Sequence, residues 1–354
     1  MTSRTIKKRI AFALIAMALS VGIAFVAILA ADLYLHSRAE KYASVNAWGY
    51  RGPRVGRKRD GERRIVVVGG STALGYCVTP ANAFPAQLES QLRPMVRKEA
   101  SVTVVNLAMN SQGAYAFPFD LEDYKYLRYD AAIFYEGYND LRDGKNLTVA
   151  RRLSPVFRLT GYFPIFPIFF HEKALALRYG DISAGYWKEK TVFKPGLANR
   201  TSAAALDAAI AVSDSLQRQL ARLDGSPAPP WDNRRATEPA HGCPARWAFY
   251  CTSQFDAITY AIERGVKVVV VTQPYIDDRH REQQQMLREM LAREFPAAGG
   301  LRYVNLGPLL DIEDKRLFYD GMHANDEGNR LIASHLVEPV AELMPDVLMP
   351  PAPR

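Results

Sequence analysis

Ser71 stands where a serine could act as a nucleophile. It follows Gly69-Gly70, which end the apolar, β-branched run Ile65–Val68. Such a run predicts a buried parallel strand, and ligands of open α/β sheets bind beyond the carboxyl ends of the strands. Serine is also a favoured helix N-cap, so Ser71 alone indicates a cap as readily as a nucleophile. Phosphate-loop and dinucleotide spacings are absent here, and Ala73 replaces the glycine of a nucleophile elbow.

A serine hydroxyl needs a base, and the base needs a carboxylate that orients it. Two Asp-x-x-His segments offer such a pair. Asp320 and His323 follow the last predicted strand, whereas Asp277 and His280 begin a strongly charged predicted helix. A solvated helix face explains the second pair, but the spacing by itself does not choose between the two.

Acyl transfer also needs hydrogen-bond donors aimed at the developing oxyanion. Gly113, through its backbone N–H, and Asn139, through its side-chain amide, follow the second and third predicted strands. Gly113 could instead serve a loop, and Asn139 a turn. Their joint placement favours a site, because Ser71, Gly113, Asn139 and the Asp320–His323 segment follow strands one, two, three and five.

These residues need a common sheet edge to bring them together. Short β-branched runs predict strands, and the segments between them have helical spacing. We expect strands at Ile65–Val68, Val102–Asn106, Ala131–Tyr135, Val266–Thr272 and Leu301–Leu306, and the clearest helices at Phe84–Leu92, Phe255–Arg264, Arg279–Phe295 and Asp326–Leu343. The alternation predicts an α/β fold with a doubly wound, flavodoxin-like parallel sheet of about five strands.

With these residues in this order, the sequence resembles the SGNH (GDSL-like) hydrolase superfamily, which is defined by four dispersed sequence blocks. The blocks correspond here to Gly69-Gly70-Ser71-Thr72, Asn106 through Gly113, Gly137-Tyr138-Asn139-Asp140 and Asp320-Gly321-Met322-His323. The first block reads Gly-Gly-Ser-Thr rather than Gly-Asp-Ser-Leu. The resemblance covers residues 65 to 343, interrupted by an insertion.

The resemblance implies a role for each of these residues. Ser71 would be the nucleophile, His323 the base and Asp320 the carboxylate that orients the base, which favours His323 over His280. The oxyanion hole would comprise the N–H of Ser71, Gly113 and Asn139, with no metal and no cofactor. Esterases, deacetylases, thioesterases and acyltransferases share the four blocks, so the resemblance does not fix the substrate.

The amino-terminal region carries a membrane signal. No charged residue lies between Ile10 and Ala31, and this run is close to the roughly 20 residues that span a bilayer. Lys7, Lys8 and Arg9 precede it and predict a cytoplasmic amino terminus. We therefore expect an uncleaved, single-pass anchor; a signal peptide cleaved within Ala27–Ala31 is the alternative. The rest of the chain would be extracytoplasmic, and periplasmic in a bacterium.

The domain organisation follows from these signals. We expect a cytoplasmic segment at 1–9, the anchor at 10–34, a polar linker at 35–63, the hydrolase-like domain at 64–345 and a tail at 346–354. A largely helical insertion at about 141–245 interrupts the domain, with an amphipathic helix indicated between Leu206 and Leu223. Its apolar, proline-punctuated run Pro155–Phe170 fits core, a membrane-facing segment or an acyl-chain groove.

Composition excludes some functions and suggests a compartment. The net charge of +8 is modest for 354 residues, and no basic stripe interleaved with aromatic residues indicates nucleic-acid binding. Only three cysteines are present, without the spacing of a zinc site. Cys243 and Cys251 are close in sequence and could pair in an oxidising compartment, which would leave Cys77 free.

Two functions of different classes fit these observations. The first is a membrane-anchored, extracytoplasmic serine hydrolase that cleaves an acyl ester of a glycan or lipid, or transfers the acyl group if an alcohol replaces water. The Pro155–Phe170 run favours a lipid-like or long-acyl substrate. The second is a non-catalytic binding module or accessory subunit of a membrane assembly.

Overall fold

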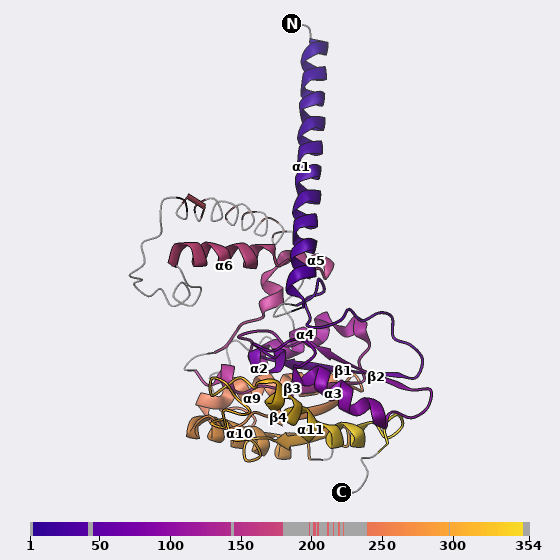
Figure 1. Ribbon diagram of the computed structural model, residues 1–354, viewed down its shortest axis with the longest axis vertical. Helices are drawn as coiled ribbons and strands as arrows, with labels where there is room; N and C mark the ends of the chain where they lie inside the picture. The colour runs from indigo at the N-terminus through magenta and orange to yellow at the C-terminus, as the bar shows by residue number, and fades with distance from the viewer. Residues whose placement is uncertain are drawn as a thin grey trace. The chain divides into compact units, whose positions relative to one another are not determined.

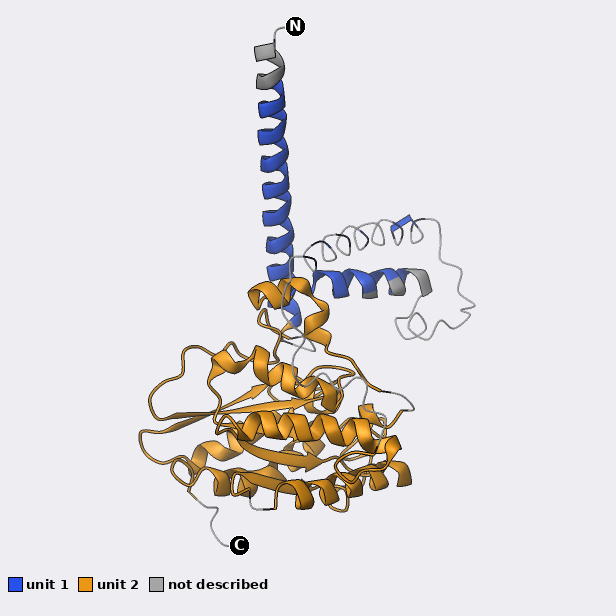
Figure 2. Cartoon of the chain, turned by 180° about the vertical axis from the view of Figure 1, so that it is seen from behind, with its two compact units in different colours: residues 1–39, 164–223 blue, residues 40–163, 224–354 orange. Residues whose placement is uncertain are grey.

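The computed structural model describes residues 3–41, 45–142, 145–179, 239–296 and 298–349, together with separate positions between 198 and 222. The chain divides into two compact units (Figure 2). Residues 1–39 and 164–223 form the first unit, and residues 40–163 and 224–354 form the second. We call the second unit the body, because it holds the sheet.

The sheet of the body has five parallel strands in the order β2-β1-β3-β4-β5 (Figure 1). The strands are β1 (Glu62–Gly69), β2 (Ser101–Asn106), β3 (Ala131–Tyr135), β4 (Lys267–Thr272) and β5 (Leu301–Asn305). This order confirms the predicted flavodoxin-like, doubly wound sheet. Val66 of β1, Ala132 of β3 and Val268 of β4 are consecutive register partners with almost no exposed surface, as expected for apolar central strands.

Two pairs of helices pack against this sheet. Helices α3 (Phe84–Leu92) and α11 (Asp326–Leu343) contact each other and the strands β2 and β5, while α4 (Phe117–Asp123) and α9 (Ala245–Ile262) contact each other and the strands β1 and β4. Helix α10 (Asp278–Glu294) packs beside α9. The shorter elements of the body are α2 (Ser71–Leu74), η1 (Arg93–Met95), η2 (Ala114–Ala116), η3 (Lys125–Leu127), η4 (Tyr138–Asp140), η5 (Ala150–Leu153) and α5 (Pro155–Thr160).

Helix boundaries follow local capping chemistry. Asn325 accepts a hydrogen bond from the N–H of Gly328 and starts α11 at the predicted residue. Helix α9 begins at Ala245, ten positions before the predicted Phe255, because Pro244 provides an extended N-cap residue. The amphipathic spacing after Phe255 indicated only the later part of this helix.

A disulfide joins Cys243, just before α9, to Cys251 within it, while Cys77 is a free, exposed cysteine. The pairing predicted as a possibility is thus present. The bond closes a short loop, with a sequence separation of 8, and so ties the start of the helix to its second turn.

We expect the double variant Cys243→Ser/Cys251→Ser to lose about 2–3 kcal/mol of unfolding free energy, since a loop of this length restricts the unfolded chain by about that amount. Urea unfolding followed by tryptophan fluorescence measures the loss. Cys77→Ser is the matched control and should leave the midpoint unchanged. A double variant as stable as wild type would contradict the expected contribution.

The segment expected as a polar linker at 35–63 is partly ordered structure. Helix α1 (Ser3–Ala39) continues through its first residues, and β1 begins at Glu62. Within the body, the N–H of Arg51 donates to the carbonyl of Asn106, and the buried Arg51 guanidinium donates to the carbonyls of Leu74 and Gly75 at 2.8 and 2.7 Å. Long-range hydrogen bonds to β2 and α2 therefore hold Arg51 in place, although the sequence around it has no regular periodicity.

The first unit contains α1 and α6 (Phe166–Tyr179). Residues Arg9–Ala39 of α1 are long and apolar enough to cross a membrane, with a mean hydropathy of 2.7 and no burial in the most apolar window. Oδ2 of Asp32 lies 3.5 Å from Nε2 of His36, and Oδ1 of Asp32 accepts the N–H of Ile165 at 3.0 Å. The predicted helix between Leu206 and Leu223 lies outside the described residues, apart from separate positions.

The apolar run Pro155–Phe170 belongs to both units, and its parts differ. In the body, the rings of Phe157 and Phe163 are buried and pack edge to face with centroids 6.1 Å apart. In the first unit, Phe166 and Phe170 contact each other, with centroids at 4.1 Å. Phe157 and Phe163 are therefore core residues, as one of the three interpretations expected, whereas Leu159 between them is exposed.

Candidate active site

The structure brings three predicted residues into one hydrogen-bonded chain. Nε2 of His323 lies 2.9 Å from Oγ of Ser71, and Nδ1 of His323 lies 2.6 Å from Oδ2 of Asp320. Ser71 and His323 are 252 residues apart in sequence. A serine, a base in hydrogen-bond contact with it and a carboxylate behind the base form the arrangement needed for an activated nucleophile.

Ser71 takes its place from the turn after β1. The N-cap of the short helix α2 is Gly70, and no side chain caps this helix, so the Ser71 hydroxyl does not act as a cap. A Cβ on Gly69 would lie 2.3 Å from the Tyr135 carbonyl oxygen, and a Cβ on Gly70 would lie 2.1 Å from Nδ2 of Asn139. Both glycines are therefore required by close approach of neighbouring strands and loops.

Asp320 holds His323 through backbone and ring contacts. Its Oδ1 accepts the N–H of His323 at 2.7 Å and that of Met322 at 3.0 Å, while Oδ2 faces the imidazole. Partial burial would raise the pKa of Asp320, but the hydrogen bonds from the backbone and ring of His323 outweigh it and lower the pKa. Asp320 therefore stays ionised and orients the ring.

Two tyrosines that the sequence analysis did not single out flank the imidazole. The ring of Tyr76 lies 4.9 Å from that of His323, and the ring of Tyr319 lies 6.1 Å away at an interplanar angle of 17°. The Tyr319 hydroxyl donates to the carbonyl of Tyr76 at 2.5 Å. These contacts restrict the ring of His323 from two directions. Tyr319 directly precedes Asp320 in sequence, which is the one signal that could have pointed to it.

Two of the three predicted oxyanion donors, Gly113 and Asn139, lie on neighbouring loops, and the third is the N–H of Ser71. Nδ2 of Asn139 donates to the carbonyl of Gln112, which precedes Gly113, at 2.9 Å. The N–H groups of Ser71 and Gly113 take part in none of the hydrogen bonds found among the described residues. The β2 and β3 loops are therefore joined at the sheet edge that carries Ser71, with two backbone donors uncommitted.

Gly113 tolerates no side chain at this junction. A Cβ there would lie 2.3 Å from Oδ1 of Asp140. We expect Gly113→Ala to lower kcat for a small ester about 100-fold, because the shifted loop misplaces an oxyanion donor. Gly299→Ala is the control, since nothing lies within 4 Å of a Cβ at that position. A Gly113→Ala enzyme with wild-type kcat would exclude this loop from the oxyanion hole.

The alternative Asp277–His280 pair has a different role. Asp277 is the N-cap of α10, and its Oδ1 accepts the N–H of His280 at 2.6 Å. His280 is fully buried, its ring lies 4.9 Å from that of Tyr138, and burial lowers its pKa to about 4. The expectation of a solvated face is wrong at His280, because this residue lies on the buried side of α10, together with Gln284 and Leu287.

The end of β4 also contributes to the site. Nε2 of Gln273 donates to Oγ1 of Thr72 at 2.6 Å, and Oε1 of Gln273 accepts the N–H of Tyr138 at 2.9 Å. One buried amide thus connects the turn after Ser71's strand with the loop of Asn139. Gln273 directly follows the strand predicted at Val266–Thr272, and the sequence analysis gave it no role.

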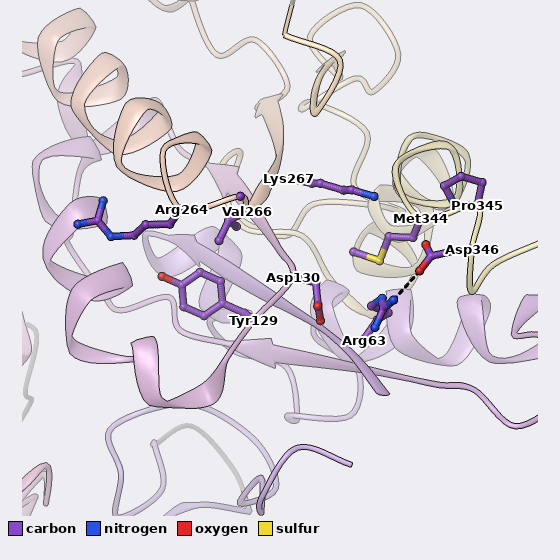
Figure 3. Close-up of a pocket in the computed structure, with 10 residues that line it drawn as sticks. Arg63, Tyr129, Asp130, Arg264, Val266, Lys267, Met344, Pro345 and Asp346 are labelled. Atoms are coloured by element: carbon purple, nitrogen blue, oxygen red, sulfur yellow. Dashed lines mark hydrogen bonds and ion pairs between the residues drawn. The ribbon is translucent and has the colours of Figure 1, made fainter. Parts of the chain in front are cut away.

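A cavity of about 570 Å³ lies at the other edge of the sheet (Figure 3). Arg63, Asp130 and Lys267, which line it, stand at or before the amino-terminal ends of β1, β3 and β4. Its basic side chains are engaged: Arg63 pairs with Asp346, and Lys267 donates to the Leu343 carbonyl. This cavity is therefore not the site of the Ser71 chemistry. Within the described ranges, no group of His, Cys, Asp and Glu could hold a metal ion.

Comparison with protein-family models and with curated proteins finds no match. Similar solved structures include a G-D-S-L family protein from Desulfitobacterium hafniense DCB-2 (12% identity, TM-score 0.39, covering 77% of this chain and 97% of that one). They also include a family 3 carbohydrate esterase from Clostridium thermocellum (11% identity, TM-score 0.39, covering 80% of this chain and 96% of that one). A mutant of an acetylxylan esterase from Geobacillus stearothermophilus is similar to the same degree (12% identity, TM-score 0.39, covering 81% of this chain and 96% of that one).

Proposed function

We propose that this protein is a serine-dependent hydrolase of acyl esters. The observation that carries the proposal is the chain Ser71 Oγ–His323–Asp320, with distances of 2.9 and 2.6 Å. A serine placed at the end of a buried strand for structural reasons alone has no need of an imidazole that is itself oriented by a carboxylate.

The proposed reaction has two steps, acylation of Ser71 and hydrolysis of the acyl-serine. Ser71 Oγ attacks the ester carbonyl while Nε2 of His323 takes its proton, and Asp320 stabilises the resulting imidazolium. The N–H groups of Ser71 and Gly113 and the amide of Asn139 bind the oxyanion. The imidazolium then protonates the leaving alcohol. Water, activated by His323, releases the acid from the acyl-serine.

Anchoring in a membrane, with the body outside the cytoplasm, completes the proposal. The apolar helix α1 and the lysines and arginine before it support an uncleaved anchor with a cytoplasmic amino terminus. The Cys243–Cys251 disulfide supports the same topology, because such bonds persist in oxidising compartments. Acylated glycans and lipids are the ester substrates we propose for this location, and an alcohol that replaces water would make the same site an acyltransferase.

A fluorophosphonate probe tests the proposal directly. The full-length, detergent-solubilised protein should react with the probe at Ser71, located by mass spectrometry of the modified peptide, and should hydrolyse p-nitrophenyl acetate. Ser71→Ala should do neither while keeping the wild-type unfolding midpoint. A folded wild-type protein that neither reacts nor hydrolyses the ester would contradict the proposal and favour a binding module.

A further inference from the structure

Two buried carboxyl groups lie behind the proposed oxyanion donors. Glu136 and Asp140 are only 1% and 9% exposed. No cationic side chain of the described residues is among the main influences on the pKa of either carboxyl group. Burying an ionised carboxylate without a counter-charge costs folding free energy. Two such groups close together must therefore accept hydrogen bonds that offset this cost, or one of them must be protonated.

Glu136 shapes the loop that carries Asn139. Its Oε1 accepts the N–H of Gly137 at 2.9 Å and the N–H of Asn139 at 3.0 Å. Its Oε2 lies 3.4 Å from Nδ2 of Asn139, whereas the bond from Nδ2 to the Gln112 carbonyl measures 2.9 Å. The longer contact is the one that an oxyanion can replace, while the shorter bond keeps the amide in place.

Asp140 holds the other loop. Its Oδ2 accepts the N–H of Ala114 at 2.8 Å, and its carboxyl group lies directly against the Cα of Gly113. Its Oδ1 is buried without a hydrogen-bond partner among the described residues. The two donors that complete the oxyanion hole are thus each held by one carboxyl group.

The groups that face this pair leave it without a positive charge. Four titratable groups face the pair: Tyr135 at the end of β3, Tyr138 in the loop after β3, Tyr250 of α9 and His280 of α10. Nε2 of His280 would lie 2.8 Å from a Cβ on Gly137. Burial raises the pKa of all three tyrosines and lowers that of His280, so all four are neutral near pH 7. Burial and the proximity of Asp140 raise the pKa of Glu136 to about 8. Burial raises the pKa of Asp140 to about 7.

We propose that Glu136 and Asp140 are the positioning residues of the oxyanion hole and hold one proton between them in the working enzyme. This inference rests on the proposed ester hydrolysis. With one proton the pair carries a single negative charge and still accepts the backbone N–H groups of both loops. Loss of that proton places a second negative charge behind the site where the oxyanion forms, and opposes the transition state.

The test compares two variants of Glu136 on p-nitrophenyl acetate. Glu136→Ala removes the acceptor for Gly137 and Asn139, and should lower kcat about 100-fold while KM stays within about twofold of wild type. Glu136→Gln mimics the protonated acid and should keep kcat within about threefold at pH 7. Wild-type kcat should fall as the pH rises above about 8, whereas Glu136→Gln should lack this alkaline decline.

Glu62 provides the matched control. It is a buried carboxyl group at the opposite end of β1, 3% exposed and bonded to Arg64. Glu62→Gln and Glu62→Ala should lower stability without changing kcat or its pH profile. A Glu136→Ala enzyme with wild-type kcat overturns the positioning role, and a Glu136→Gln enzyme as slow as Glu136→Ala at pH 7 overturns the shared proton.

Infrared spectroscopy separates this inference from the proposed function. The wild-type protein at pH 7 should show the carbonyl stretch of a protonated carboxylic acid, and Glu136→Gln should lose it. Absence of that band overturns the shared proton even in a fully active enzyme. Its presence in a protein that neither hydrolyses the ester nor reacts with the probe would mean that only the proposed function fails.

Discussion

Replacing His323 by alanine is expected to slow the hydrolysis of p-nitrophenyl acetate by about 10⁴- to 10⁶-fold in kcat, because the Ser71 hydroxyl then has no base at 2.9 Å. The measurement is steady-state turnover of the full-length protein in detergent, with folding checked by circular dichroism. Labelling by the fluorophosphonate should be lost to a similar extent. The remaining activity would come from the oxyanion donors and from binding alone.

The same measurement compares the loss of kcat on replacing Asp320 with the loss on replacing His323. Asp320→Asn should cost about 10²- to 10³-fold, less than loss of the base, because the Asp320 side chain is 41% exposed and water can partly take its place. His241→Ala is the control, since His241 stacks on Phe255 in another part of the body. A His323→Ala variant within tenfold of wild type would rule out His323 as the general base.

The largest effect on stability is expected at Arg151. Both Arg151 and its ion-pair partner Asp120 are completely buried, with 2.8 Å between Nη1 and Oδ1. Arg151 also donates to the carbonyls of Gly49 and Leu107. We expect Arg151→Met to lose about 3–5 kcal/mol of unfolding free energy, because it leaves the charge of Asp120 buried without a counter-charge, with only the Gln112 amide as a hydrogen-bond donor.

The neighbouring arginine is a natural control for this prediction. Arg152 pairs with Asp123 at 2.6 Å, but the two side chains are 27% and 17% exposed. Arg152→Met should cost less than about 1 kcal/mol, as solvent-accessible ion pairs do. Urea unfolding of the wild-type protein, Arg151→Met and Arg152→Met measures the two losses of unfolding free energy. Equal losses at both positions would show that packing of the side chain, rather than the buried charge, determines the stability at Arg151.

The strands and their carboxyl-end loops could be predicted because their signals are local. The apolar run Ile65–Val68 falls within β1, and Ala131–Tyr135 matches β3 residue for residue. Parallel strands place their following loops at one sheet edge, so the order of Ser71, Gly113, Asn139 and His323 along the chain was enough to predict their meeting.

The supporting residues could not be predicted, because their signals lie in contacts between distant segments. Glu136 is a single charged residue after an apolar strand, which the sequence alone cannot distinguish from a solvated strand end. Tyr76 approaches Tyr319 across 243 residues, and Gln273 meets Thr72 across 201. His280 shows the converse error, since the charged neighbours that suggested solvent exposure lie on the other side of its helix.

Arg51 connects the backbone carbonyls at and after the end of α2, the short helix that begins with Ser71, to the stretch that precedes β1. A fragment that begins beyond Arg51 would therefore keep every residue of the hydrogen-bonded chain from Ser71 to Asp320, yet would lack the guanidinium that holds the turn directly after Ser71.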